Sequence, residues 1–149
     1  MNPSTSSQCG VLLLAHGARD PRWALPFEAV LQRLRESLAG SIPAEAVSLC
    51  FLEFMSPGIV AAGHALAASG CDEIHLVPLF LGGGGHVRKD IPALLAELQQ
   101  AHPGVRWLLH PPVGEAPAVI DALAATALAL LGSGAAPEPG APSTAGDRQ

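Results

Sequence analysis

The sequence has few charged residues, no excess of basic ones and no long apolar run. Only 14% of its 149 residues are charged and 49% are hydrophobic, which excludes an intrinsically disordered chain. The formal net charge of −5 argues against a general nucleic-acid binder, because such a protein needs a basic face. No apolar run approaches the ~20 residues that a membrane helix requires, so we expect no membrane partner.

Cysteine is also scarce. Cys9, Cys50 and Cys71 are odd in number, widely spaced and form no C-x-x-C pair. This pattern argues against a disulfide framework or a zinc ribbon and predicts reduced thiols in the cytoplasm. The first ten residues, MNPSTSSQCG, contain no basic region or apolar core, so we expect no signal peptide.

Four short apolar runs alternate with segments of helical periodicity. The expected strands are residues 11–15, 47–54, 74–81 and 105–109, and the expected helices are residues 20–39, 56–70, 90–102 and 116–131. This alternation predicts an α/β fold with a single four-stranded parallel sheet flanked by helices, in a flavodoxin- or Rossmann-like layering. We expect a flexible leader at residues 1–9, a domain at residues 10–131, and a disordered tail rich in Gly, Ala and Pro at residues 132–149.

Two histidines directly follow buried strands. His16 follows the first strand, and His86 follows the third strand and the glycine run. Right-handed crossovers place all strand-to-helix loops at one edge of a parallel sheet, where open α/β folds bind their ligands. A lone histidine there is best explained as a helix cap or a partner of a loop carbonyl. Two on matching loops, each followed within three residues by a base, favour a shared functional site.

The other histidines show no such placement. His64, His75 and His102 look ordinary for a helix, a strand and a helix end. His110 ends the fourth strand and is a reserve candidate.

Positive charge gathers around the same two loops. Half of the eight lysines and arginines lie there: Arg19, Arg22, Arg88 and Lys89. A local cationic rim on an acidic protein predicts a small anionic ligand. The alternative is a pair of solvated helix starts, although bases in a first turn oppose the helix dipole and Asp20 and Asp90 offset them only partly.

The glycine run at residues 82–85 matches neither nucleotide-binding motif. His-Val-Arg follows Gly85 where a P-loop needs Lys-Ser/Thr, and Val87 stands where a dinucleotide motif needs its last glycine. The run does permit backbone to lie close under a flat or bulky ligand. The alternative is a flexible loop without a role.

Glu53 is expected near the end of the second strand, and Ser56 just after it. Glu53 suits a proton acceptor, a metal ligand or a hydrogen-bond partner, but a capping interaction explains it equally well. Ser56, before Pro57, fits a helix cap better than a ligand group.

Three segments together resemble the small sirohydrochlorin chelatases, the short CbiX-type relatives of the class II chelatases. They are LLLAHGARDP at 12–21, FLEFMSPGI at 51–59 and VPLFLGGGGHVRKDIP at 77–92. The resemblance implies that His16 and His86 bind the incoming metal, that His16 accepts a proton, and that two copies pair as a homodimer. It also implies tetrapyrrole contacts by Ser56, Leu81, Gly82, Gly83, Gly84, Gly85 and His86.

Three positions depart from the family pattern. The first motif, commonly His-Gly-Ser, is His16-Gly17-Ala18 here. Gly83 stands where some members have an extra histidine, and Ser56 stands where some have a carboxylate. The departures bear on the metal and on the macrocycle contacts, and they leave the histidine pair intact.

The implied reaction inserts a divalent metal into sirohydrochlorin, on the way to cobalamin or siroheme. Two pyrrole N–H protons must leave, and imidazole, with a pKa of ~6.5, both accepts protons and ligates cobalt, iron or nickel. We expect cobalt first, Glu53 as a further catalytic residue, and Arg19 and Arg88 as partners of the macrocycle carboxylates. The metal is a substrate, and no prosthetic group is expected.

Two rival functions remain open. A metal carrier would use the same ligands without a tetrapyrrole pocket. A histidine phosphatase also ends a strand in His-Gly, but it needs an arginine just before the histidine, where this chain has Ala15.

Overall fold

The computed structural model describes residues 7–134, and the chain divides into two compact units after Ala116. The strands are β1 (Cys9–Ala15), β2 (Val47–Phe51), β3 (Glu73–Pro78) and β4 (Arg106–Leu109). The α-helices are α1 (Leu25–Ser37), α2 (Ile59–Ala68), α3 (Gly85–Ala101) and α4 (Pro117–Gly132). Three short 3-10 turns, η1 (Pro21–Ala24), η2 (Ala44–Ala46) and η3 (Val113–Glu115), complete the described elements.

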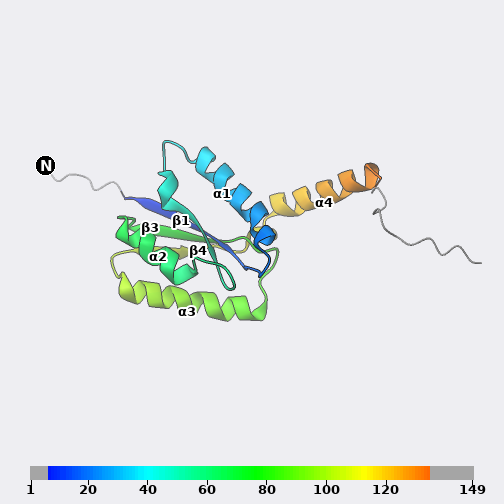
Figure 1. The fold of residues 1–149 in the computed structure, drawn as a ribbon. Coiled ribbons are helices and arrows are strands. Elements are labelled where there is room, and N and C mark those ends of the chain that lie inside the picture. Colours follow the sequence, from blue (N-terminus) through cyan, green and yellow to red (C-terminus); the bar gives the residue numbers. More distant parts are fainter. Residues whose placement is uncertain (1–6, 135–149) are drawn as a thin grey trace, which may run out of the picture. The chain divides into compact units, whose positions relative to one another are not determined.

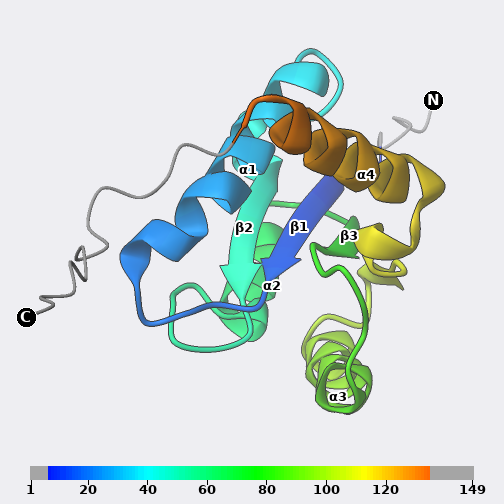
Figure 2. The ribbon, with the colours of Figure 1, turned by 90° about the vertical axis from the view of Figure 1, so that its right-hand side faces the viewer.

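The four strands form one parallel sheet in the order β2-β1-β3-β4. Helix α1 covers one face, and α2 and α3 cover the other (Figures 1 and 2). The predicted α/β fold with a four-stranded parallel sheet is therefore confirmed. Because all strands run the same way, their carboxyl ends share one edge, and the loops that leave this edge carry the predicted site residues.

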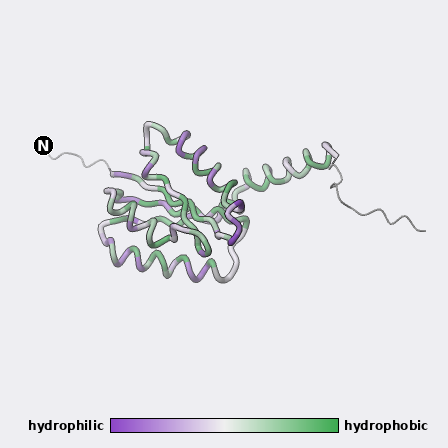
Figure 3. Tube along the Cα trace, viewed as in Figure 1, coloured by the Kyte–Doolittle hydropathy of each residue, from purple (hydrophilic) through white to green (hydrophobic). Residues whose placement is uncertain are grey.

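Strand β1 lies in the centre of the sheet and is buried on both sides. Leu12 and Leu14 pack into the core beneath α2 and α3, while Val11 and Leu13 pack beneath α1. This is why its sequence reads as an unbroken apolar run. Figure 3 shows the same contrast, with mostly apolar strands between α1 and α3, in which polar and apolar residues alternate.

Small residues let α2 approach α3 closely. A Cβ on Gly63 would lie 2.7 Å from Leu98 Cδ1 and 3.1 Å from the ring of Trp107. Leu98 is fully buried at this contact. The close approach depends on glycine, because any side chain at this position would push α2 away from α3.

Several element boundaries differ from the predicted ones. Strand β2 ends at Phe51 rather than at residue 54, so Glu53 lies in the following loop. Helix α3 begins at Gly85 rather than at residue 90, so that Pro92 lies inside it. The reason is that Gly84 takes an extended conformation (φ −73°, ψ 164°) and caps the helix early, as glycine is able to do at this position.

The described part of the second unit consists almost entirely of helix α4. It matches the helix expected at residues 116–131, whereas the expected domain limits of 10–131 stay a prediction. Most of the expected leader and tail, at residues 1–6 and 135–149, falls outside the described residues. Between residues 7 and 134, no helix is both long and apolar enough to cross a membrane.

Candidate functional site

His16 and Glu53 meet at the carboxyl edge of the sheet. The ladder between β1 and β2 continues past both strands, because Leu52 N–H donates to Ala15 O (3.1 Å) and Glu53 N–H to His16 O (3.1 Å). The two side chains then lie together, with His16 Nε2 and Glu53 Oε1 2.9 Å apart. Each is 51% exposed, so the pair is held in place yet open to a ligand.

The loop after β2 turns tightly to place Glu53. Met55 N–H donates to Glu53 O at 2.8 Å, and Phe51 N–H donates to Pro57 O at 2.9 Å. Between them Phe54 adopts a φ of 62°, which is costly for a bulky side chain. Its ring is 59% exposed, and the Arg19 guanidinium lies 5.1 Å from the ring centroid. Strained residues of this kind concentrate at binding and catalytic sites.

Two cavities flank His16: one has the carboxylates of Glu53 and Asp90 in its lining, and the other is lined almost entirely by apolar residues and glycines. The first, of about 610 Å³, is lined by His16, Leu52, Glu53, Val87, Asp90, Ala93 and Leu94. The second, of about 470 Å³, is lined by His16, Trp23, Phe27, Leu79, Phe80, Leu81, Gly82, Gly84, Gly85 and Val87. His16 borders both, with its ring centroid 6.2 Å from that of Phe80. It is thus placed between a site for charge and a surface for a flat apolar ligand.

The loop that follows β4 holds the start of the glycine loop in place. Gly114 N–H donates to Phe80 O at 2.9 Å, and its α-carbon lies so close to the Leu81 backbone that no side chain fits there. Leu81 itself is 68% exposed. Gly83 and Arg88 line a third cavity of about 180 Å³, together with His110.

His86 lies in the first turn of α3 rather than in a loop, which corrects the predicted placement. The preceding Gly85 borders the apolar cavity beside His16, so the N-terminus of α3 is at the same edge as β1. That the rings of His16 and His86 bind one metal ion stays a prediction.

The cationic rim is smaller than the sequence predicts. Arg22 Nη2 pairs with Asp20 Oδ2 at 2.8 Å, and this pairing lowers the pKa of Asp20. Asp20 also caps η1 by accepting a hydrogen bond from Arg22 N–H at 3.0 Å. Arg19 lies over Phe54, while Arg88 and Lys89 are exposed.

Ser56 is not the helix cap that its sequence position suggests. Helix α2 is capped by Gly58, and no side chain bonds to its first turn. Ser56 is exposed and lies outside the linings of the three cavities described above. A contact between Ser56 and a tetrapyrrole stays a prediction.

Sequence reasoning missed several residues that border the cavities, among them Asp90, Trp23 and Phe27. Asp90 lines the same cavity as Glu53, and Trp23 and Phe27 form part of the apolar one. For Asp90 a signal was present, because it follows His86 by four residues and therefore shares its helical face. Trp23 and Phe27 carry no comparable signal, since apolar residues at helical spacing are read as core.

Comparison with known proteins agrees with this architecture. The family model CbiX matches residues 10–129. The sirohydrochlorin cobaltochelatase of Sulfurisphaera tokodaii is 32% identical over 108 residues, which cover 70% of this chain and 79% of that protein. The sirohydrochlorin ferrochelatase of Priestia megaterium is 32% identical over 113 residues, 76% of this chain but only 41% of the longer relative.

A solved structure shows the same fold. The crystal structure of a CbiX protein from Marinobacter aquaeolei VT8 superposes with a TM-score of 0.68 at 32% identity, covering 84% of this chain and 98% of that one. The resemblance read from the three sequence segments is confirmed. With the sheet order, the His16 loop and 120 matched residues (10 to 129) in agreement, the chain belongs to the CbiX family.

Proposed function

We propose that this protein is a sirohydrochlorin chelatase that inserts cobalt or iron into the macrocycle. The observation that carries the proposal is the His16–Glu53 pair, 2.9 Å apart, between a cavity lined in part by two carboxylates and an apolar cavity. The names of the Sulfurisphaera and Priestia relatives, a cobaltochelatase and a ferrochelatase, support the same activity.

The apolar cavity suits one face of the tetrapyrrole. Leu79, Phe80, Trp23 and Phe27 line it together with Leu81, Gly82, Gly84 and Gly85 at its glycine-rich rim. A glycine-rich rim lets a planar ligand approach the backbone, since no Cβ stands in the way. Among the bases, Arg19, Arg88 and Lys89 are exposed and available to the macrocycle carboxylates.

His16 and Glu53 then divide the work of metal insertion. The His16 ring accepts a pyrrole N–H proton, and the carboxylate 2.9 Å away stabilises the imidazolium that forms. Neutral imidazole nitrogen and carboxylate oxygen are also ligands for a divalent ion in transit. We assign metal binding to His16 and His86, with Glu53 as the third group.

The metal and the assembly are finer parts of the proposal. Cobalt is our first choice and iron and nickel are alternatives, because these ligands do not discriminate among the three ions. We also propose a homodimer: one chain spans 41% of the Priestia ferrochelatase, so two copies supply a comparable length. The cytoplasmic location remains a prediction from cysteine usage.

The test is an absorbance assay of sirohydrochlorin with Co²⁺, Fe²⁺ or Ni²⁺ in turn. Wild-type protein should accelerate the spectral change of insertion, and His16→Ala should lose most of that acceleration. His64→Ala is the matched control, because His64 is an exposed histidine on α2 that bonds His102. Full activity of His16→Ala would contradict the role given to this residue.

The same assay separates the rival functions. A metal carrier would bind the ion without changing the sirohydrochlorin spectrum. A phosphatase would turn over a phosphate ester, although the residue before His16 is the buried Ala15 and offers no cation for phosphate.

A further inference from the structure

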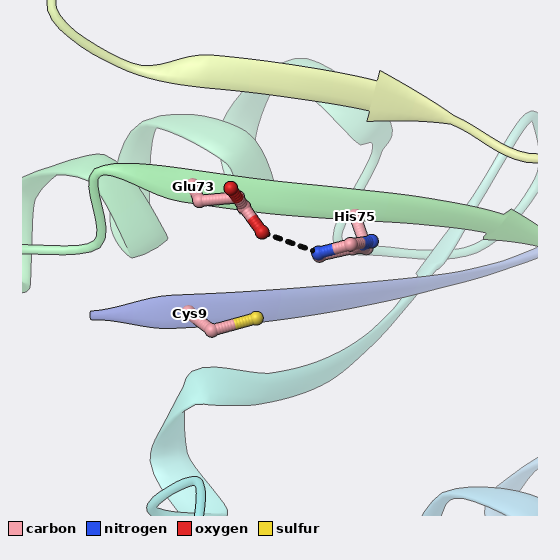
Figure 4. A group of neighbouring side chains, drawn as sticks. All are labelled: Cys9, Glu73 and His75. Carbon is pink, nitrogen blue, oxygen red and sulfur yellow. Dashed lines mark hydrogen bonds and ion pairs between the residues drawn. The ribbon is translucent and has the colours of Figure 1, made fainter. Parts of the chain in front are cut away.

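Three metal-binding residue types meet near the start of the sheet, away from the site described above. Cys9 is the first residue of β1, and Glu73 and His75 lie on β3, where Cys9 pairs with Glu73 in the parallel register. One ligand atom of each lies within 4.8 Å of the other two. Figure 4 shows the three side chains close together, on the same side of the two strands.

A hydrogen-bonded network orients this cluster. His75 Nε2 lies 2.9 Å from Glu73 Oε1, and His75 Nδ1 lies 2.7 Å from His110 Nε2. The rings of His75 and His110 are nearly parallel, at 12°. Arg106 pairs with Glu73 Oε2. These contacts orient two of the three side chains. Nε2 of His75 points to Glu73, and one oxygen of Glu73 pairs with Arg106.

The thiol of Cys9 is not explained by this network. Its recorded hydrogen bond is a 3.8 Å contact to Gly10 O, which is weak. A thiol beside an imidazole and a carboxylate becomes a strong metal ligand when a cation displaces its proton.

We propose that Cys9 Sγ, His75 Nε2 and one oxygen of Glu73 bind a tetrahedral divalent ion of the Zn²⁺ class. Thiolate, imidazole and carboxylate are the ligands that zinc takes in proteins, and two nitrogen or oxygen ligands at about 2.0 Å lie roughly 3.3 Å apart on a tetrahedral ion. The 2.9 Å between His75 Nε2 and Glu73 Oε1 widens only slightly to accept it. The fourth position is left to water.

The neighbouring residues position the ligands. With the ion on Nε2, the Nδ1–H of His75 donates to His110 Nε2, and Arg106 keeps the second oxygen of Glu73. Outer partners of this kind fix the orientation of metal-binding histidines and carboxylates. The side chains of His75 and Glu73 are 24% and 20% exposed, which leaves a path for the ion while excluding most water.

This site is separate from the candidate chelatase site. Cys9 begins β1 and His16 follows its end, so a strand of roughly 20 Å lies between them at ~3.3 Å per residue. An ion here ties the first residue of β1 to β3. No sequence pattern indicates this site, because His75 reads as an ordinary strand residue and Cys9 as a lone thiol.

The test is a Co²⁺ titration of metal-free protein under anaerobic conditions. Co²⁺ replaces Zn²⁺ in tetrahedral sites, and a thiolate ligand adds a near-ultraviolet charge-transfer band. We expect one such band per chain, its loss in Cys9→Ala and its weakening in His75→Gln. Zn²⁺ should abolish it by displacing Co²⁺, since it binds such ligands more tightly.

Controls separate this site from the proposed chelatase centre. Cys50→Ala removes a thiol from β2 and should keep the band, as should His16→Ala. Cys9→Ala should keep sirohydrochlorin metal insertion. The proposal is overturned if Co²⁺ binds without a sulfur band, if the band survives Cys9→Ala, or if it disappears in His16→Ala.

A measurement on wild-type protein covers the case in which a variant does not fold. Zn²⁺ should protect Cys9 from alkylation, as read by mass spectrometry of the peptide that contains it. Equal labelling of Cys9 with and without Zn²⁺ would also overturn the site.

Discussion

The backbone carbonyl of Glu53 occupies the space in which a Cβ on Gly17 would lie. Gly17 also has a φ of 97°, a conformation that favours glycine. The residue after His16 is therefore glycine for two independent reasons. Both reasons serve the same end, because this close approach is what holds the His16 and Glu53 side chains within hydrogen-bond distance.

Gly17→Ala should separate His16 from Glu53 and remove most metal insertion. The matched control is Gly40→Ala, because Gly40 has a similar φ of 85° but no atom within 4 Å of its Cβ position. Backbone strain alone should cost each variant about 1–3 kcal/mol in urea unfolding. Only Gly17→Ala should lose activity in addition; equal activity losses in the two variants would contradict this account.

Gly114→Ala should weaken substrate binding without touching the His16–Glu53 pair. A methyl group at this position collides with the Leu81 backbone and displaces the glycine loop that borders the apolar cavity. We expect KM for sirohydrochlorin to rise more than kcat falls. Gly104→Ala, with open space around the added Cβ, should leave both constants unchanged.

The sequence predicts those parts of the protein whose cause is local. The buried run of β1 and the small residues of α2 specify their elements directly, because burial on both faces and close packing each leave a pattern in the chain. For His16 and Glu53, the sequence predicts only that both lie near the same edge of the sheet. Their 2.9 Å contact depends on a strand ladder extending two residues beyond β2, which no periodicity reveals.

The start of α3 shows that a local sequence pattern can also mislead. Asp90-Ile91-Pro92 has the chemistry of a helix start, yet Gly84 caps the helix earlier and Pro92 lies inside it. Proline is a weak marker here because its position in the chain alone does not say which turn of a helix it occupies. The Cys9–Glu73–His75 cluster was not predicted for a related reason. It depends on the register between β1 and β3, which is set by the whole sheet.

Glu53→Gln should test whether the carboxylate charge matters. Glutamine keeps the size and a hydrogen-bond acceptor 2.9 Å from His16 but does not stabilise an imidazolium or bind a cation equally well. We expect kcat for metal insertion to fall about 10²-fold, the lower end for loss of a general acid–base group. Glu45→Gln, at an exposed position in η2, is the control. Unchanged kcat in Glu53→Gln would reduce Glu53 to a loop-positioning residue.

The Cys50 thiol should make the protein less stable at alkaline pH. Burial raises its pKa from 9.0 to about 12, so the folded state keeps the proton while the unfolded state loses it. The stabilisation from the neutral thiol is complete below pH 9 and is lost as pH rises towards 12. Between those values the free energy of unfolding should fall by about 1.4 kcal/mol per pH unit from this residue alone. Urea unfolding at pH 8 and at pH 10.5 measures this decrease in the free energy of unfolding. In Cys50→Ala the decrease between the two pH values should be smaller by the contribution of the thiol. An identical pH dependence in the variant would show that other groups cause it.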